Sequence, residues 1–243
     1  MGIRGILFDK DGTLIDFPAT WEPVLRALAG EFAKNDSRSA EELLALAGYD
    51  PQLKEFTPGS VWAAGHTLDL VRAWAPGTDP RREADLVRWV DDFCASAAPD
   101  SAMALTDLQV LFGTLAEAGY LLGVATNDNE RSARATMARL GVLDRFALVM
   151  GYDSVPDPKP GAGMVRKFCE ATGLAPQEVA VVGDNLHDVE MARAAGAGLA
   201  IGVLSGNARR EHLEDHADHL IDSIVGLPAL LLEIRERRQA HVL

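Results

Sequence analysis

Residues 3–14 read Ile-Arg-Gly-Ile-Leu-Phe-Asp-Lys-Asp-Gly-Thr-Leu, and this stretch decides how the rest of the chain is interpreted. Its apolar part, residues 3–8, predicts a short buried strand that ends at two carboxylates, Asp9 and Asp11. Because side chains alternate along a strand, both carboxylates are expected on one side, with Gly12 allowing a sharp turn. Two acids so placed can divide the chemistry, since one can attack or bind a metal while the other transfers protons. The alternative is an ordinary Asp-rich turn after a strand, because Asp-x-Asp-Gly is also common turn chemistry.

The composition is that of a soluble globular protein and excludes several classes of partner. The chain has 243 residues, of which 48% are hydrophobic and 24% charged. Its formal net charge of −13 argues against a nucleic-acid or anionic-membrane partner, because polyanions would be repelled. No apolar run is long enough to span a bilayer and no signal peptide precedes the first strand, so we expect a cytoplasmic protein. The oligomeric state, monomer or homodimer, stays open.

The two cysteines are also those expected of a cytoplasmic protein. Cys94 and Cys169 show no metal-ligand spacing. We expect both to fill helix faces rather than to form a disulfide or bind a metal, which suits a reducing cytoplasm.

A long helical insertion follows the first strand. Between Asp16 and about Ala98 the apolar spacing is helical, and no strand is predicted there. The expected helices cover residues 23–32, 40–47, 61–74 and 83–97. Four helices without strands could form a small bundle, so residues 16–99 are predicted to be a separate helical domain.

From Thr106 onward, helices alternate with strands. Strands are predicted at residues 121–125, 147–150, 179–182, 198–202 and 219–221, and helices at 107–118, 131–140, 163–172, 189–195 and from 224. This alternation predicts right-handed βαβ units and a mostly parallel, doubly wound α/β sheet. The first strand belongs to the same sheet, so residues 1–15 and 100–243 are predicted to form one Rossmann-like core domain.

Three further turns, each following a predicted strand, carry polar side chains. They are Thr126-Asn127-Asp128-Asn129, Asp157-Pro158-Lys159-Pro160 and Gly183-Asp184-Asn185-Leu186-His187-Asp188. Because the carboxyl ends of parallel strands border one crevice, we expect these turns to gather around the first two acids. Clustered carboxylates repel one another unless a divalent cation neutralises them, and oxygen ligands indicate Mg²⁺. A metal, a lysine, a hydroxyl and backbone donors together match the oxygens of a phosphoryl group.

The order of these motifs resembles that of the haloacid dehalogenase (HAD) superfamily, on the phosphatase branch that includes phosphoglycolate phosphatases. Asp9-Lys10-Asp11-Gly12-Thr13 matches the first motif, Thr126 the second, Lys159 the third and Gly183-Asp184-x-x-x-Asp188 the fourth. The likeness spans residues 3 to about 228. It implies a Mg²⁺-dependent phosphate monoester hydrolase that acts on a small phosphorylated metabolite through an aspartyl-phosphate, with phosphoglycolate as the leading named substrate.

The resemblance also implies a role for each motif residue. Asp9 would attack phosphorus, while Asp11 would protonate the leaving alcohol and then activate the hydrolytic water. Thr126 and the backbone N–H of Asn127 would bind phosphate, and Lys159 would bridge the phosphate and the nucleophile.

The same resemblance implies the metal ligands. Asp184 would hold Mg²⁺ together with a carboxylate oxygen of Asp9 and the backbone carbonyl of Asp11. Asp188 would support the metal shell directly or through water.

The insertion resembles the helical C1 cap of this branch, with hinges at residues 15–18 and 99–106. A closing cap would exclude water and contact the leaving group. The candidates for lining the cleft are Asp16, Phe17, Trp21 and His66, although packing or a solvated surface is the commoner role for such residues. Lys10 stands between the paired acids, and alternation predicts that its side chain points away from both, in a structural or rim role.

Two rival functions follow from the same fold. A β-phosphoglucomutase-like phosphomutase would pass the phosphate to another sugar hydroxyl, but Asp16-Phe17-Pro18 does not obviously supply the hinge of such mutases. A non-catalytic HAD-fold binding or regulatory protein is the other rival, and degenerate members of that kind tend to lose the nucleophile, the acid or the lysine. Asp9, Asp11 and Lys159 are all present here. An acid at the position of Asp11 also favours a phosphatase or phosphomutase over a dehalogenase.

Overall fold

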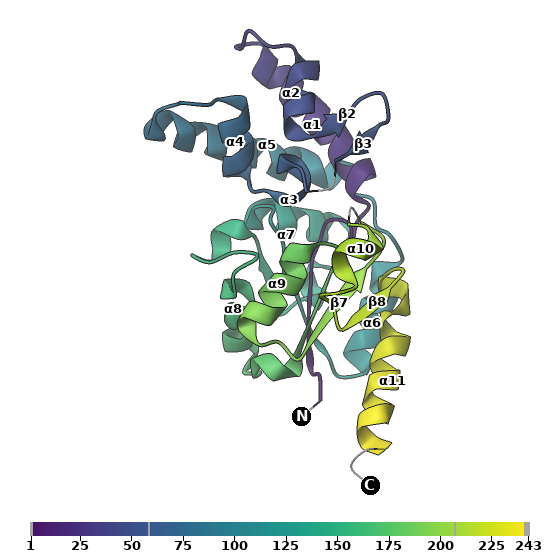
Figure 1. The fold of residues 1–243 in the computed structure, drawn as a ribbon. Coiled ribbons are helices and arrows are strands. Elements are labelled where there is room, and N and C mark those ends of the chain that lie inside the picture. The colour runs from purple at the N-terminus through teal and green to yellow at the C-terminus, as the bar shows by residue number, and fades with distance from the viewer. Residues whose placement is uncertain (1, 58, 207, 241–243) are drawn as a thin grey trace.

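A six-stranded parallel sheet forms the centre of the molecule (Figure 1). The computed structural model describes residues 2–57, 59–206 and 208–240. The strands are β1 (Gly5–Phe8), β4 (Leu121–Ala125), β5 (Leu148–Met150), β6 (Val179–Gly183), β7 (Leu199–Val203) and β8 (His219–Ile221). They lie in the order β5-β4-β1-β6-β7-β8, and every neighbouring pair is parallel. The predicted doubly wound α/β core is therefore confirmed, with β1 in the middle of the sheet.

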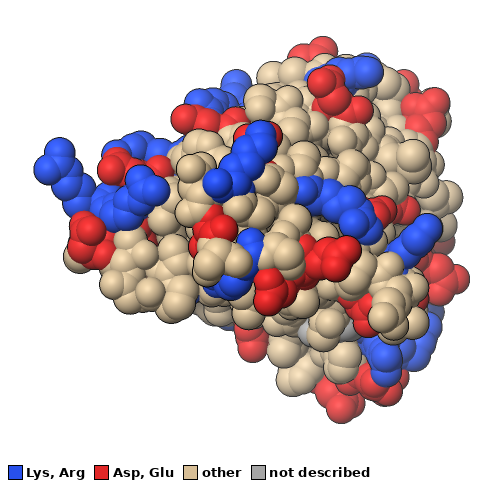
Figure 2. Space-filling model, turned by 90° about the horizontal axis from the view of Figure 1, so that it is seen from above, with Lys and Arg blue, Asp and Glu red and all other residues tan. Residues whose placement is uncertain are grey.

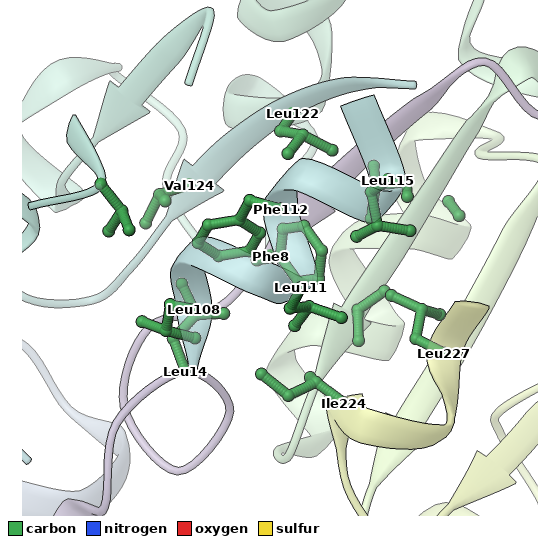
Figure 3. Close-up of a cluster of buried hydrophobic side chains, with 14 of the residues drawn as sticks. Phe8, Leu14, Leu108, Leu111, Phe112, Leu115, Leu122, Val124, Ile224 and Leu227 are labelled. Carbon is green, nitrogen blue, oxygen red and sulfur yellow. The ribbon is translucent and has the colours of Figure 1, made fainter. Parts of the chain in front are cut away.

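Helices cover both faces of the sheet, so the core has three layers. On one face lie α6 (Leu108–Glu117), α7 (Glu130–Arg139) and α11 (Leu227–Ala240); on the other lie α8 (Gly163–Thr172), α9 (Leu186–Ala195) and α10 (Arg210–Leu213). The side chains of β1 are divided by alternation, because Ile6 and Phe8 pack on the first face and Leu7 on the second. Figure 3 shows Phe8 against Phe112 of α6, with ring centroids 5.6 Å apart. A strand buried on both faces explains why residues 5–8 are apolar without alternation.

Short 3₁₀ helices complete several connections. They are η1 (Leu143–Arg145), η2 (Tyr152–Ser154), η3 (Pro176–Glu178) and η4 (Ile224–Gly226). The helix predicted from residue 224 thus begins as η4 and continues as α11. The other core elements match their predicted ranges apart from their ends, where caps rather than apolar spacing set the boundary.

The inserted residues form helices with an apolar cluster of their own. These helices are α1 (Phe17–Ala33), α2 (Ala40–Ala47), α3 (Val61–Ala64), α4 (Thr67–Trp74) and α5 (Pro80–Ser101). Trp21, Leu28, Leu43 and Trp74 belong to this cluster, which is distinct from the two clusters that flank the sheet. In Figure 1 the insertion lies above the end of the sheet to which the strands point, so it faces the carboxyl ends of the strands.

Two predictions about the insertion were wrong. Residues 61–74 form two helices instead of one, because the chain is extended at Gly65 and His66, where α3 ends and α4 begins. The insertion is also not free of strands, since β2 (Tyr49–Asp50) and β3 (Glu55–Phe56) make a small antiparallel pair. Gly48, with a φ of 91°, ends α2 and redirects the chain into this pair.

The insertion is in contact with the core through side chains. Asp91 of α5 accepts hydrogen bonds from the Tyr152 hydroxyl of the core at 2.9 Å and from the Thr67 hydroxyl at 2.6 Å. The Asn127 amide donates to the Ala64 carbonyl at 3.1 Å. These bonds place α3 and α5 directly over the ends of the core strands.

Charged side chains of both signs lie on the face of the molecule that carries the insertion (Figure 2). Figure 2 looks down on the insertion side and shows basic and acidic side chains interspersed over that face. None of the helices in the described ranges combines the length and apolar composition that a bilayer crossing requires. Cys94 of α5 and Cys169 of α8 are both buried in helices, as predicted, and both are free thiols.

Candidate active site

The carboxyl ends of β1, β4 and β6, together with the loop between β5 and α8, bring the predicted residues together. A cavity between core and insertion is lined by Asp9, Asp11, Asn127, Lys159, Asp184 and Asp188. Thr126 lies just behind this lining, where its hydroxyl donates to Asp11 Oδ2 at 3.2 Å. All of the predicted site residues therefore lie in one place, and the roles assigned to them stay predictions.

Lys159 is the central cation of the site. Its Nζ lies 2.6 Å from Asp9 Oδ1 and 2.5 Å from Asp188 Oδ1, and only 3% of its side chain is exposed. Burial alone would lower the pKa of Lys159, but the carboxylates of Asp188 and Asp9 raise it above the ordinary lysine value. Lys159 is therefore protonated at neutral pH and joins the first and fourth motifs electrostatically.

The loop that carries Lys159 closes on an aspartate. The Asp157 carboxylate accepts from the Ala162 backbone N–H at 3.0 Å. A Cβ on Gly161 would lie 1.9 Å from Asp157 Oδ1, and one on Gly163 would lie 2.3 Å from the Asp157 carbonyl oxygen. The two glycines therefore give the aspartate its space, which explains their presence where a helix begins.

Opposing effects act on the pKa of Asp9. Burial raises the pKa of Asp9 to about 7, an effect that the nearby Lys159 ammonium opposes and that the carboxylates of Asp188 and Asp11 reinforce. A bound cation at this carboxylate would favour its ionised form.

Three of the four predicted metal ligands form a cluster that fits a divalent cation. Asp9, Asp184 and Asp188 are buried, and each offers a carboxylate oxygen within 4.8 Å of the others. An all-oxygen donor set of this kind is what Mg²⁺ prefers. The backbone is closed tightly around it, because a Cβ on Gly206 would lie 1.9 Å from Asp184 Oδ2 and one on Gly183 would lie 2.2 Å from the Asp188 carboxyl carbon. The side chain of Asp11 is not part of this cluster, so the prediction for that residue rests on its backbone carbonyl alone.

Substitution of Gly206 should therefore weaken Mg²⁺ binding. In Gly206→Ala the new methyl group would displace the Asp184 carboxylate, and we expect the Kd for Mg²⁺ to rise at least about tenfold, as for other changes beside a metal ligand. Isothermal titration of Mg²⁺ measures this directly. Gly113→Ala is the matched control, because a Cβ at Gly113 meets nothing within 4 Å. Equal Mg²⁺ affinity in both variants would show that Asp184 does not hold the metal.

Asp11 is held by three donors. Its Oδ1 accepts from the Trp21 indole at 2.5 Å and from Lys10 Nζ at 3.0 Å, while Oδ2 accepts from Thr126. Both oxygens of the carboxylate are thus fixed in direction. A carboxyl group in a fixed position is suited to transferring a proton to or from one particular atom.

The prediction that Lys10 points away from both acids was wrong. Its side chain is fully buried, and its Nζ lies 3.0 Å from Asp11 Oδ1, 3.0 Å from Asp128 Oδ2 and 4.8 Å from the centroid of the Trp21 ring. The physical reason is that β1 ends at Phe8, so strand alternation does not extend to residues 9–11. The chain turns there instead, with the backbone N–H groups of Leu14 and Ile15 both donating to the Lys10 carbonyl.

Asp128 is the residue that sequence reasoning missed. Burial raises its pKa, while the Lys10 ammonium opposes this rise. Lys10 remains charged, because the carboxylates of Asp11 and Asp128 raise its pKa against the effect of burial. The only sequence signal was the position of Asp128 after a predicted strand, and nothing in the sequence pairs it with Lys10.

The insertion supplies the opposite wall of the cavity. Phe17, Trp21 and His66, three of the four candidates named from the sequence, lie in the lining. Asp16 does not, because its carboxylate caps α1 by accepting from the Ala19 backbone N–H at 2.8 Å.

The chain is similar in sequence and in fold to known phosphatases and hydrolases. A family model described as haloacid dehalogenase-like hydrolase matches residues 3–196. A phosphoglycolate phosphatase of Chromobacterium violaceum is 31% identical over 230 residues, which cover 94% of this chain and 96% of that protein. An N-acetylmuramic acid 6-phosphate phosphatase of Pseudomonas aeruginosa is 28% identical over 238 residues, covering 98% and 96% of the two chains. The fold is similar to the crystal structure of a predicted phosphoglycolate phosphatase from Haemophilus somnus, with a TM-score of 0.69 at 19% identity over 94% of this chain and 97% of that one.

Proposed function

Since the chain belongs to the haloacid dehalogenase-like hydrolase family, we propose that it is a phosphatase that hydrolyses phosphate monoesters of small metabolites. The observation that carries the proposal is the buried ion pair of Lys159 with Asp9 and Asp188, beside a second acid, Asp11, that donors hold in place. The relatives named phosphoglycolate phosphatase make phosphoglycolate the first named substrate to test.

The proposed reaction has two steps, both centred on Asp9. A carboxylate oxygen of Asp9 forms a bond to phosphorus while the bond from phosphorus to the alcohol oxygen breaks, and Asp11 gives its proton to the departing alcohol. In the second step a water loses a proton to Asp11 and attacks phosphorus, which releases phosphate and restores both carboxyl groups. Asp11 is suited to both transfers because Trp21 and Lys10 hold its orientation.

Charge is the main obstacle that this site must overcome. A phosphate monoester dianion repels a carboxylate nucleophile, and the protonated Lys159 beside Asp9 reduces that repulsion. Thr126 and the Asn127 N–H are proposed to bind the phosphate oxygens at the end of β4. Asp9, Asp184 and Asp188, with the Asp11 carbonyl, would hold Mg²⁺, which when bound neutralises charge on the phosphoryl oxygens.

We further propose that residues 16–99 act as a cap domain on the core formed by residues 1–15 and 100–243. The two segments that connect them lie side by side: the Asp16 N–H donates to the Met103 carbonyl at 2.8 Å, and the Leu105 N–H donates to the Leu14 carbonyl at 3.0 Å. Adjacent connections suit a hinge, because both can bend about one axis. The separate apolar cluster of the insertion supports motion as a unit.

The direct test is phosphate release from a panel of phosphorylated metabolites. We expect release that requires Mg²⁺ and that stops when EDTA removes the metal, because three clustered carboxylates would otherwise repel the substrate. Inorganic phosphate is measured against time for each ester. Transfer of the phosphate to a second sugar hydroxyl instead of water would identify the phosphomutase alternative. Mg²⁺ binding without any turnover on the panel would favour the non-catalytic alternative.

A further inference from the structure

The wall of the cavity that faces the carboxylates is apolar. It is lined by residues of the insertion, namely Phe17, Trp21, Val61, Trp62, Leu70 and Val90. The rings of Trp21 and Trp62 meet edge to face, with centroids 5.4 Å apart and planes at 80°. If phosphate binds at the core residues, this wall is what the alcohol half of the ester contacts.

Positive charge is scarce around this wall. Among the described residues that line the cavity, Lys159 is the only lysine or arginine, and Asp9 and Asp188 already pair with it. The ammonium of Lys10 is nearby but completely buried between two carboxylates. Any cation that Asp9, Asp184 and Asp188 would hold is matched by those three carboxylates. A carboxylate on the alcohol half would therefore enter a negative, partly apolar site that offers it no unpaired lysine or arginine among the described lining residues, which is costly.

His66 does not supply the missing charge. Burial lowers its pKa below the ordinary histidine value, and His187 lowers it further, while Asp69 and Asn127 act in the opposite direction without reversing the shift. The imidazole is therefore neutral at neutral pH and can offer only a hydrogen bond.

Unpartnered polar atoms accompany the apolar wall. The Trp62 Nε1, the His66 Nε2 and the Asn127 Oδ1 are buried without a hydrogen-bond partner. Asn127 lies near enough to His66 to influence its pKa, but these two atoms do not reach hydrogen-bond geometry with each other. An indole N–H, an imidazole nitrogen and an amide oxygen are neutral groups that a ligand hydroxyl can satisfy as both donor and acceptor. Leaving them unpaired is unfavourable, so a ligand that bonds them is preferred.

We propose that the natural substrate is the phosphate ester of an uncharged, hydroxyl-bearing alcohol such as a sugar or polyol, and that esters bearing a carboxylate, phosphoglycolate among them, are poor substrates. The inference rests on the proposed function and specifies its leaving group. Aromatic faces contact the carbon-bound hydrogens of such an alcohol, and the neutral polar atoms bind its hydroxyls. The negative charge of the surrounding carboxylates selects against an acid.

Three phosphate esters of two-carbon alcohols test the proposal. Ethyl phosphate, 2-hydroxyethyl phosphate and 2-phosphoglycolate differ only in their second carbon, which is a methyl group, a hydroxymethyl group or a carboxylate. We expect kcat/KM with Mg²⁺ to be at least about tenfold higher for the hydroxyethyl ester than for phosphoglycolate, a difference of about 1.4 kcal/mol. The hydroxyethyl ester should also exceed the ethyl ester, because its hydroxyl satisfies a buried polar atom.

Two variants identify the groups responsible. Trp62→Phe removes the indole N–H but keeps an aromatic ring, so the ratio of kcat/KM between hydroxyethyl and ethyl phosphate should fall. Val61→Lys adds an ammonium to the apolar wall and should raise kcat/KM for phosphoglycolate relative to hydroxyethyl phosphate. Val61→Met, which adds comparable length without charge, should leave that second ratio unchanged.

The outcomes separate the two proposals. Phosphoglycolate turned over as well as or better than the hydroxyethyl ester would overturn the inference and leave the proposed phosphatase standing. An unchanged hydroxyethyl-to-ethyl ratio in Trp62→Phe would overturn the assigned hydroxyl contact. No phosphate release from any ester, by a folded protein that binds Mg²⁺, would overturn the proposed function itself and the inference with it.

Discussion

Replacement of Asp9 by Asn should abolish phosphate release, with kcat falling on the order of 10⁴-fold or more, as happens when a covalent nucleophile is removed. The amide has nearly the shape of the carboxylate but cannot attack phosphorus. Lys159 keeps its contact with Asp188 in this variant, so we expect the fold to survive. The measurement is phosphate release with Mg²⁺ on whichever ester the wild-type protein hydrolyses fastest.

The matched control for this variant is Asp85→Asn. Asp85 is exposed on α5 and is not part of the cavity lining, so the same chemical change there should leave turnover near the wild-type rate. Circular dichroism and thermal unfolding of both variants establish that loss of activity is not loss of structure. Turnover by Asp9→Asn within tenfold of the wild type would contradict a nucleophilic role for Asp9.

Replacement of Lys10 by Met should destabilise the folded protein by about 3–5 kcal/mol, the usual cost of removing one partner from a buried ion pair. Methionine has a similar length, but it would leave Asp11 and Asp128 facing each other without the ammonium between them. The free energy of unfolding from urea titration measures the effect. Because Lys10 also holds Asp11, a fall in kcat should accompany it.

Two comparisons make this second prediction specific. Adding Asp128→Asn to Lys10→Met removes one of the two carboxylates that have lost the lysine ammonium. This second change should restore part of the lost free energy of unfolding, which a double-mutant cycle measures. Arg4→Met is the control at an exposed pair, since the Arg4 side chain is 64% exposed where it meets Glu178 and such pairs contribute about 0–1 kcal/mol. A loss in Lys10→Met no larger than in Arg4→Met would mean that the buried pair does not stabilise the fold.

The parallel core could be predicted because its signals are local. The apolar content of residues 5–8 is enough to predict a buried strand. The alternation of strands and helices after Thr106 restricts the topology to few arrangements. Asp9 and Asp184 gather because each comes directly after a strand of one parallel sheet, while Lys159 reaches them from the loop between β5 and α8. Their chemical roles stay predictions until the variants are measured.

The wrong predictions concern segments whose structure depends on residues outside the local sequence pattern. The helix over residues 61–74 looked continuous because its apolar spacing continues through Gly65, whose extended backbone separates α3 from α4. The pairing of Tyr49–Asp50 with Glu55–Phe56 is too short to leave a strand pattern. Asp16 looked like a cleft residue, but its carboxylate is used to begin α1.

The sheet, the order of the motifs and the family could all be read from the amino-acid sequence, because each depends on residues that are neighbours along the chain or on the directions of parallel strands. The folded structure was needed to show that Lys10 joins Asp11 to Asp128 beneath Trp21, and that the wall opposite the carboxylates, in the part of the chain that the structure describes, is largely aromatic and carries no lysine or arginine. Those contacts bring together side chains from the turn after β1, from α1 and α3, and from the turn after β4, and sequence spacing does not give the distances between them. The charge and hydrogen bonding that select a substrate depend on those distances, so specificity is a property of the folded chain.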